Sequence, residues 1–137
     1  MDFSLSEEQR MLKDTVERLV RETYDFEKRQ KIADSEEGFS REVWGQLAEL
    51  GLLGVPFPED FGGLGGGGID LMVVGEAIGQ GLVVEPYRAT VVLGGGLVEL
   101  LGSDAQKEEI LGAVVGGEKL LAFAHGEPDG RYETAHV

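Results

Sequence analysis

The chain has 137 residues, of which 42% are hydrophobic and 7% aromatic, a composition typical of one folded domain rather than of a disordered segment. Its 12 Lys and Arg against 26 Asp and Glu give a formal net charge of −14, which argues against binding to nucleic acid or to an anionic membrane surface. Because the sequence has no Cys and only two His, disulfides and thiolate chemistry are excluded and no metal site is expected.

The N-terminal residues predict a long helix rather than a targeting signal. Residues 1–10 are acidic and lack the apolar stretch of a signal peptide, and no run reaches the roughly 18 apolar residues of a membrane span. We therefore expect a cytoplasmic protein with no membrane partner. Ser6 and Gln9 have the spacing of a capping box, and apolar residues then recur every three or four positions. This pattern predicts one helix over residues 6–31.

Four further helices follow in the pattern. One begins after Ser40 and ends before Gly51, a glycine suited to the left-handed residue that follows a helix. The others are expected over about 70–80, over about 88–101, and from a second capping box at Ser103 onward. No segment before residue 115 alternates with a period of two for long enough to be a strand. The predicted fold class is all-α, a helical bundle of about five helices.

The C-terminal residues predict a strand. Residues 119–124 are short, apolar and bounded by glycine and proline, which is the pattern of a buried strand. A single strand cannot pair its own backbone groups, because its ladder partners are missing. We therefore expect two parts: a helical domain over 1–115, and the truncated start of a β domain over 116–137.

A glycine-rich loop at residues 63–68, GLGGGG, matches the G-x-G-x-x-G fingerprint of dinucleotide-binding loops. Such a loop must follow a parallel strand, but Pro56 and Pro58 precede it, and neither fits a central strand. Asp60 and Asp70 place negative charge beside the loop, which opposes a phosphate. We interpret the stretch as a mobile or tightly turning connector between two helices.

Three consecutive glycines, Gly94 to Gly96, interrupt the predicted helix over 88–101. They cost roughly 2–3 kcal/mol in helix propensity relative to alanine. Such a cost indicates a close approach to the helix at this point. The approach could come from another helix or from a ligand, and the second alternative would widen a binding pocket.

Four stretches, in matching order, make the chain resemble the N-terminal domain of acyl-CoA dehydrogenases. They are MDFSLSEEQRMLKDTVERLV over 1–20, LGLLGVPFPEDFGGLGGGGIDLMVVGEAIG over 50–79, LGSDAQKEEILGAVVGGEKL over 101–120, and FAHGEPDG over 123–130. The resemblance covers the whole chain, which would form roughly the first third of a full-length member.

The resemblance implies an enzyme that oxidises the Cα–Cβ bond of an acyl-CoA thioester. In that family a bound FAD accepts hydride from the β carbon while a carboxylate base removes the α proton. The base belongs to a C-terminal domain of the family, so no catalytic residue is assigned here and the fragment alone is expected to be inactive. The family further implies an acceptor like electron-transfer flavoprotein and a homo- or hetero-tetramer.

Candidate flavin contacts follow from the same resemblance. Phe123, His125 and Gly126 stand where the family's flavin-facing strand would run. The family usually has a Thr at the position of Gly126, so this chain would offer only a backbone donor there. A structural role is the alternative for His125.

Two replaced positions set the chain apart from the usual pattern. Arg131 and Tyr132 stand in place of the family's Gly-Ser pair, and this variant resembles the small subunit of pimeloyl-CoA dehydrogenase-type enzymes. We expect Arg131 to meet an anionic group, either a substrate carboxylate or a CoA phosphate. The alternative is that Arg131 and Tyr132 pair with local acids such as Glu133.

Candidate substrate contacts also lie near the glycine run, because this region lines the acyl-binding cavity in the family. They are Tyr87, Val91 and Gly95, and a widened pocket there would suit a long or bulky acyl group. The competing interpretation of the whole chain is a non-catalytic helical interaction module, or a degenerate partner subunit of a hetero-oligomeric dehydrogenase.

Overall fold

The structure is a computed structural model that describes residues 4–130 and 133, and this part of the chain is all-helical. The helices are α1 (Glu7–Thr23), α2 (Phe26–Ala33), α3 (Arg41–Glu49), α4 (Gly68–Gln80), α5 (Gly96–Leu101) and α6 (Asp104–Val115), with the 3-10 turns η1 (Leu52–Gly54) and η2 (Glu59–Phe61) and the π-helical segment η3 (Arg88–Gly95). The predicted all-α class is confirmed, with six α-helices rather than about five. None of the helices in the described part is long and apolar enough to cross a bilayer.

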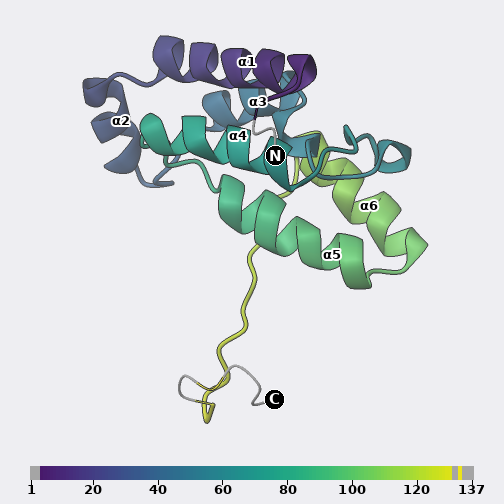
Figure 1. Cartoon of the computed structure of the whole chain (residues 1–137). Coiled ribbons are helices and arrows are strands. Elements are labelled where there is room, and N and C mark those ends of the chain that lie inside the picture. The colour runs from purple at the N-terminus through teal and green to yellow at the C-terminus, as the bar shows by residue number, and fades with distance from the viewer. Residues whose placement is uncertain (1–3, 131–132, 134–137) are drawn as a thin grey trace.

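The helices form one packed body (Figure 1). Helix α1 lies along α4, and η3 continues directly into α5, which is followed by α6. The core fills the space between these elements and is made of Val16, Leu19, Trp44, Leu47, Leu52, Leu53, Val55, Phe57, Val74, Ala77, Tyr87, Val91, Leu111 and Val114.

Local capping signals are confirmed. The capping boxes at Ser6 and Ser103 both form, and the Ser40 side chain accepts from the backbone at the start of α3. Gly51 has φ 72°, the left-handed conformation expected after a helix.

The prediction of one helix over 6–31 is wrong, because the chain breaks between α1 and α2. Asp25 caps α2 by accepting the Lys28 amide at 2.8 Å. The preceding residue, Tyr24, is buried, and its hydroxyl hydrogen-bonds to the carboxylate of Glu85. The Asp25 cap and the Tyr24–Glu85 hydrogen bond together end α1 here, although apolar residues keep their helical spacing beyond this point.

The glycine-rich loop is a tightly turning connector between η2 and α4. The amides of residues 64–66 donate to carbonyls of residues 54–57 at 2.8–2.9 Å. A Cβ at Gly63 would lie 2.0 Å from the Phe57 carbonyl oxygen, so only glycine fits there. Since these amides are already used inside the loop, they are not free to bind a pyrophosphate.

The glycine run is approached by side chains of the protein itself. A Cβ at Gly94 would lie 2.5 Å from Cβ of Leu121, and one at Gly95 would lie 2.4 Å from Cζ of Phe57. Nothing lies within 4 Å of the corresponding point at Gly96. The first two glycines therefore permit close packing of a loop and of the C-terminal segment against η3.

The strand predicted over 119–124 is not formed among the described residues. Residues 118–121 lie irregularly against the helical body, and residues 122–127 then run away from it as an open segment, as Figure 1 shows. Backbone pairing is missing because no neighbouring strand exists in the described part of the chain. The Thr90 side chain instead accepts from the Leu121 amide and donates to its carbonyl, both at 3.3 Å.

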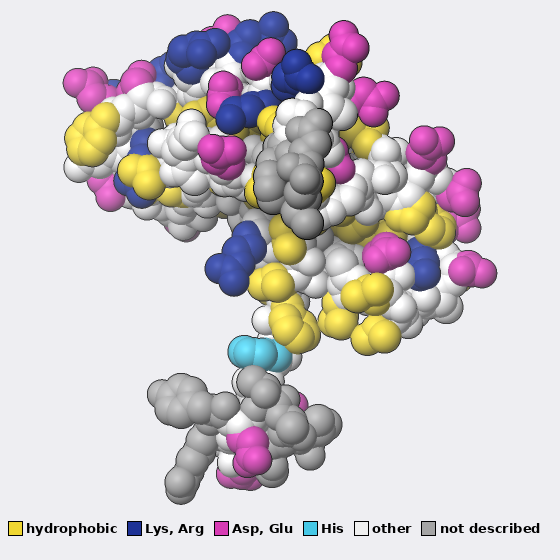
Figure 2. Space-filling view, viewed as in Figure 1, with side chains coloured by type: hydrophobic (Ala, Val, Ile, Leu, Met, Phe, Trp, Pro, Cys, Tyr) yellow, Lys and Arg dark blue, Asp and Glu magenta, His cyan; other side chains and the backbone are white. Residues whose placement is uncertain are grey.

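Apolar side chains gather where this segment leaves the body (Figure 2). Those that are large and exposed on η3, α5 and the segment itself are Val92, Leu93, Leu97, Leu100, Leu101, Leu120 and Phe123. Leu100 and Leu101 are 75% and 77% exposed, so one side of α5 has no cover within the described structure.

Candidate functional site

A groove of about 460 Å³ opens between α4 and η3. Its lining consists of Leu71, Met72, Gly75, Ile78, Gly79, Val83, Glu85, Tyr87, Arg88 and Val92. Gly75 and Gly79 lie four apart on one face of α4, and nothing lies within 4 Å of the point where a Cβ on either would sit. The space at the groove therefore exists partly because α4 has no side chain at these two positions.

A buried carboxylate is among the groups that line the groove. Glu85 is 5% exposed, and one carboxylate oxygen hydrogen-bonds to the Tyr24 hydroxyl. The other oxygen accepts the Ser40 amide at 3.0 Å. Burial and the neighbouring Glu85 raise the pKa of Tyr24 above its ordinary value, so the hydroxyl keeps its proton and donates. This carboxylate is therefore occupied by the protein and joins the groove to the starts of α2 and α3.

Tyr87, one of the predicted substrate contacts, is among the residues that line the groove. It is 4% exposed, and its hydroxyl donates to the Leu52 carbonyl at 2.9 Å. Burial raises the pKa of Tyr87, so the hydroxyl remains a neutral donor. The ring offers apolar surface to the groove, while the polar atom is used within the core.

Arg88 differs from the other polar groups of the lining. Its side chain is exposed, and the guanidinium makes no ion pair or hydrogen bond with another described residue. Sequence reasoning did not select Arg88 or Glu85. A signal was present for Arg88, because it is the only charged residue between positions 86 and 98.

The other residues predicted at the pocket lie elsewhere. Val91 is 0% exposed in the core, and Gly95 is buried against Phe57. The face of η3 that lines the groove carries Arg88 and Val92 instead. The structure therefore brings only Tyr87 of the three named residues to this groove.

The candidate flavin contacts lie on the C-terminal segment. The rings of Phe123 and His125 are 5.5 Å apart between centroids and tilted by 46°. Phe123 is 44% exposed, and nothing lies within 4 Å of the point where a Cβ on Gly126 would sit. Such an open strip does not by itself enclose a cofactor. Arg131 and Tyr132 lie outside the described residues.

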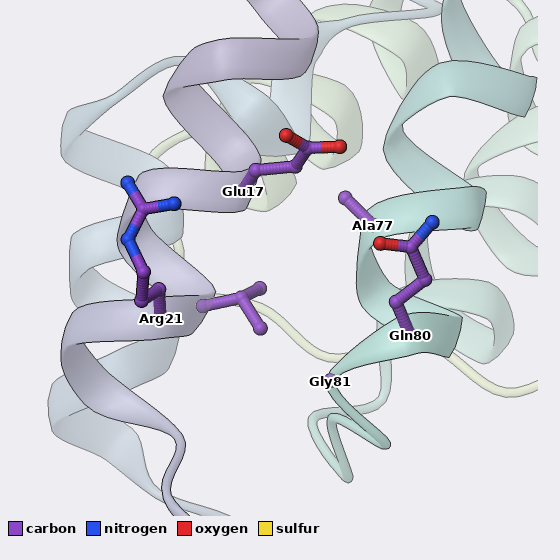
Figure 3. A pocket seen from close by; sticks show the side chains of 6 residues that line it. Glu17, Arg21, Ala77, Gln80 and Gly81 are labelled. Carbon is purple, nitrogen blue, oxygen red and sulfur yellow. The ribbon is translucent and has the colours of Figure 1, made fainter.

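A smaller hollow of about 260 Å³ lies between α1 and α4. Figure 3 shows Glu17 and Arg21 on α1 and, across from them, Ala77 and Gln80 on α4. A Cβ at Gly81 would lie 2.1 Å from Cγ1 of Val20, so the helices meet closely at this end. No buried titratable group lines the hollow, and we regard it as a packing seam. The described residues also contain no cluster of three His, Cys, Asp or Glu side chains that could hold a metal ion.

Comparisons with known proteins agree with the fold and with the sequence resemblance. The family model for the acyl-CoA dehydrogenase N-terminal domain matches residues 6–118. A probable acyl-CoA dehydrogenase, YngJ of Bacillus subtilis, is 32% identical over 136 residues, which are 94% of this chain and 34% of that protein. The mitochondrial isovaleryl-CoA dehydrogenase of Pongo abelii is 38% identical over 128 residues, 91% of this chain and 30% of that protein.

Solved structures are similar over the same region. A chain of the ChsE4–ChsE5 complex from Mycobacterium tuberculosis has a TM-score of 0.85 at 31% identity, covering 94% of this chain and 36% of that chain. An acyl-CoA dehydrogenase complexed with FAD from Bacillus anthracis has a TM-score of 0.82 at 28% identity, covering 91% of this chain and 22% of that one. The chain spans about a third of the length of the curated relatives just named. By its sequence and its helices, it belongs to the acyl-CoA dehydrogenase N-terminal domain family.

Proposed function

We propose that the protein containing this chain is an FAD-dependent acyl-CoA dehydrogenase, which oxidises the Cα–Cβ bond of an acyl-CoA thioester. The observation that carries the proposal is the family match, which extends from α1 through α6. The groove between α4 and η3 supports it, because its mainly apolar lining suits a hydrocarbon chain. In this proposal the acyl group lies in the groove and Tyr87 contacts it, whereas Val91 and Gly95 support η3 from the core.

FAD would supply the hydride acceptor of this reaction. Phe123, His125 and Gly126 would form one edge of its site, and their open arrangement is consistent with a cofactor shared with other parts of the protein. We assign 1–115 to the helical domain and 116–137 to the start of a β domain. The exposed apolar side of α5 would then be covered by the remaining protein. The catalytic base would lie outside residues 1–137, and this chain alone would be inactive.

The acyl group and the partners are proposed from the sequence variant. Arg131 and Tyr132 would favour a dicarboxyl or bulky acyl-CoA. We further propose that the protein is a homo- or hetero-tetramer in the cytoplasm. An acceptor like electron-transfer flavoprotein would reoxidise its flavin. The similarity to a chain of the ChsE4–ChsE5 complex supports the hetero-oligomeric form.

A second candidate is a partner subunit that does not bind flavin itself. Gly126, in place of the family's usual Thr, favours this candidate, because a hydroxyl contact to the flavin ring would be lost. In that form the chain would be an interaction module within a mixed dehydrogenase.

The visible absorbance spectrum of the full-length protein tests the two candidates. The protein would be purified with and without the product of its neighbouring gene, and acyl-CoA would then be added under anaerobic conditions. If the first candidate is right, the protein should show a flavin spectrum that bleaches when the substrate reduces the cofactor. A colourless protein in both preparations would overturn the first candidate and favour the second. The 137-residue chain alone is the control and should be colourless.

A further inference from the structure

We propose that the groove accepts an acyl chain whose far end carries a carboxylate, and that Arg88 binds that carboxylate. The inference rests on the proposed function, narrows its substrate class to dicarboxyl acyl groups, and adds a specificity-determining residue within the described structure. It is independent of Arg131, which lies outside that part of the chain.

The polar groups buried in the lining of the groove already have partners within the protein. The carboxylate of Glu85 is occupied by Tyr24 and Ser40, and the Tyr87 hydroxyl is occupied by the Leu52 carbonyl. A ligand group with amides, such as pantetheine, would lose its water there without gaining a side-chain partner from either residue. A hydrocarbon chain loses nothing of this kind and buries apolar surface against residues such as Leu71 and Ile78.

The lining of the groove is buried at Glu85 and exposed elsewhere. Glu85 is 5% exposed, and its carboxylate would disfavour a second carboxylate beside it. Arg88 is exposed, as are Met72, Gly75, Gly79 and Val92, so the groove is open to water along α4 and η3. The one cation among the described lining residues is therefore accessible from water.

The guanidinium of Arg88 is available to a ligand, because it has no partner among the described residues. Arg88 is followed by the uncharged stretch 89–98, and the nearest acid before it, Glu85, is already bonded to Tyr24 and Ser40. The planar fork of an arginine matches a carboxylate in two parallel hydrogen bonds. An apolar chain ending in an anion is complementary to an apolar groove that carries this exposed arginine.

The experiment measures binding to the full-length protein by calorimetry, with octanedioyl-CoA, octanoyl-CoA, CoA and free octanedioate as probes. Arg88→Gln should weaken octanedioyl-CoA binding about tenfold, as expected for one charge-assisted hydrogen bond at a partly exposed site, and change octanoyl-CoA binding less than about twofold. Arg18→Gln, at an exposed arginine of α1 away from the groove, is the matched control and should change neither. Gly79→Ala, which places a methyl group in the groove, should weaken both thioesters and leave CoA alone unaffected.

Each outcome decides the inference. Equal losses for the two thioesters in Arg88→Gln, or a matching loss for CoA alone, would mean a phosphate contact and overturn it. An unchanged affinity of octanedioyl-CoA in Arg88→Gln or in Gly79→Ala would overturn it as well. If both thioesters bind equally well to the wild type, the inference fails while the proposed function survives. If octanedioate binds through Arg88 but neither thioester binds, the inference survives and the proposed function fails, and absence of all binding removes both.

Discussion

Gly95→Ala should destabilise the protein even though alanine is the better helix former. A Cβ at this position would lie 2.4 Å from Cζ and 3.0 Å from Cε1 of Phe57, a side chain that is only 1% exposed. The enclosed ring cannot move aside without displacing its own neighbours. Overpacking of this kind costs about 1–3 kcal/mol, and the 2.4 Å approach indicates the upper end of that range. The higher helix propensity of alanine offsets about 1 kcal/mol of this cost, so the free energy of unfolding should fall by about 2 kcal/mol.

The neighbouring glycine provides a control of opposite sign. Gly96 has helical backbone angles, φ −60° and ψ −37°, and nothing lies within 4 Å of the point where its Cβ would be. Gly96→Ala should therefore raise the free energy of unfolding by about 0.8–1 kcal/mol, from helix propensity alone.

Urea unfolding followed by far-ultraviolet circular dichroism would measure both variants. Phe57→Leu removes the two ring atoms that the new methyl group would meet. The double variant with Gly95→Ala should therefore be more stable than the sum of the single effects, by about 1–2 kcal/mol. If Gly95→Ala were as stabilising as Gly96→Ala, or if the double variant were additive, packing against Phe57 would not explain the glycine.

Three further predictions concern single side chains. Leu82 has φ 49° and is 62% exposed, so Leu82→Gly should raise the urea midpoint by relieving about 0.5–1 kcal/mol of backbone strain, and a lower midpoint would contradict this. Thr90→Val should speed hydrogen exchange of the Leu121 amide about fivefold while the amides of α1 keep their rates, and an unchanged Leu121 rate would argue against the contact. Because burial raises the pKa of Tyr87, the unfolded chain ionises first and stability should fall as the pH rises above about 10. The fall in the free energy of unfolding between about pH 8 and pH 11 should be shallower in Tyr87→Phe. Equal falls in the two proteins would refute a raised pKa of Tyr87 as its cause.

The starts of α1, α3 and α6 and the end of α3 could be predicted from the sequence, because each is decided within a few residues. Ser6, Ser40 and Ser103 accept backbone amides three positions ahead, and Gly51 takes the left-handed conformation directly after α3. The all-α class followed from the helical spacing of apolar residues, which reports burial on one face of each helix.

The break after α1 could not be predicted in the same way. The hydroxyl of Tyr24 is hydrogen-bonded to Glu85, 61 positions later in the chain, and no local pattern contains that partner. The lining of the groove is a second case. The resemblance that suggested Val91 and Gly95 locates a region of the chain and not one face of its helix. In the structure η3 turns Arg88 and Val92 toward the groove, whereas Val91 and Gly95 lie in the core.

The C-terminal segment shows how the two candidate sites are joined physically. The indole nitrogen of Trp44 donates to the Gly117 carbonyl at 3.1 Å, and Thr90 bonds to both backbone groups of Leu121. Trp44 is 3% exposed and Thr90 0%, so both contacts come from rigid parts of the core. The point at which residues 122–127 leave the body is therefore held by α3 and η3. Since η3 also supplies one wall of the groove, the same segment holds the groove and the start of the path toward the proposed flavin edge.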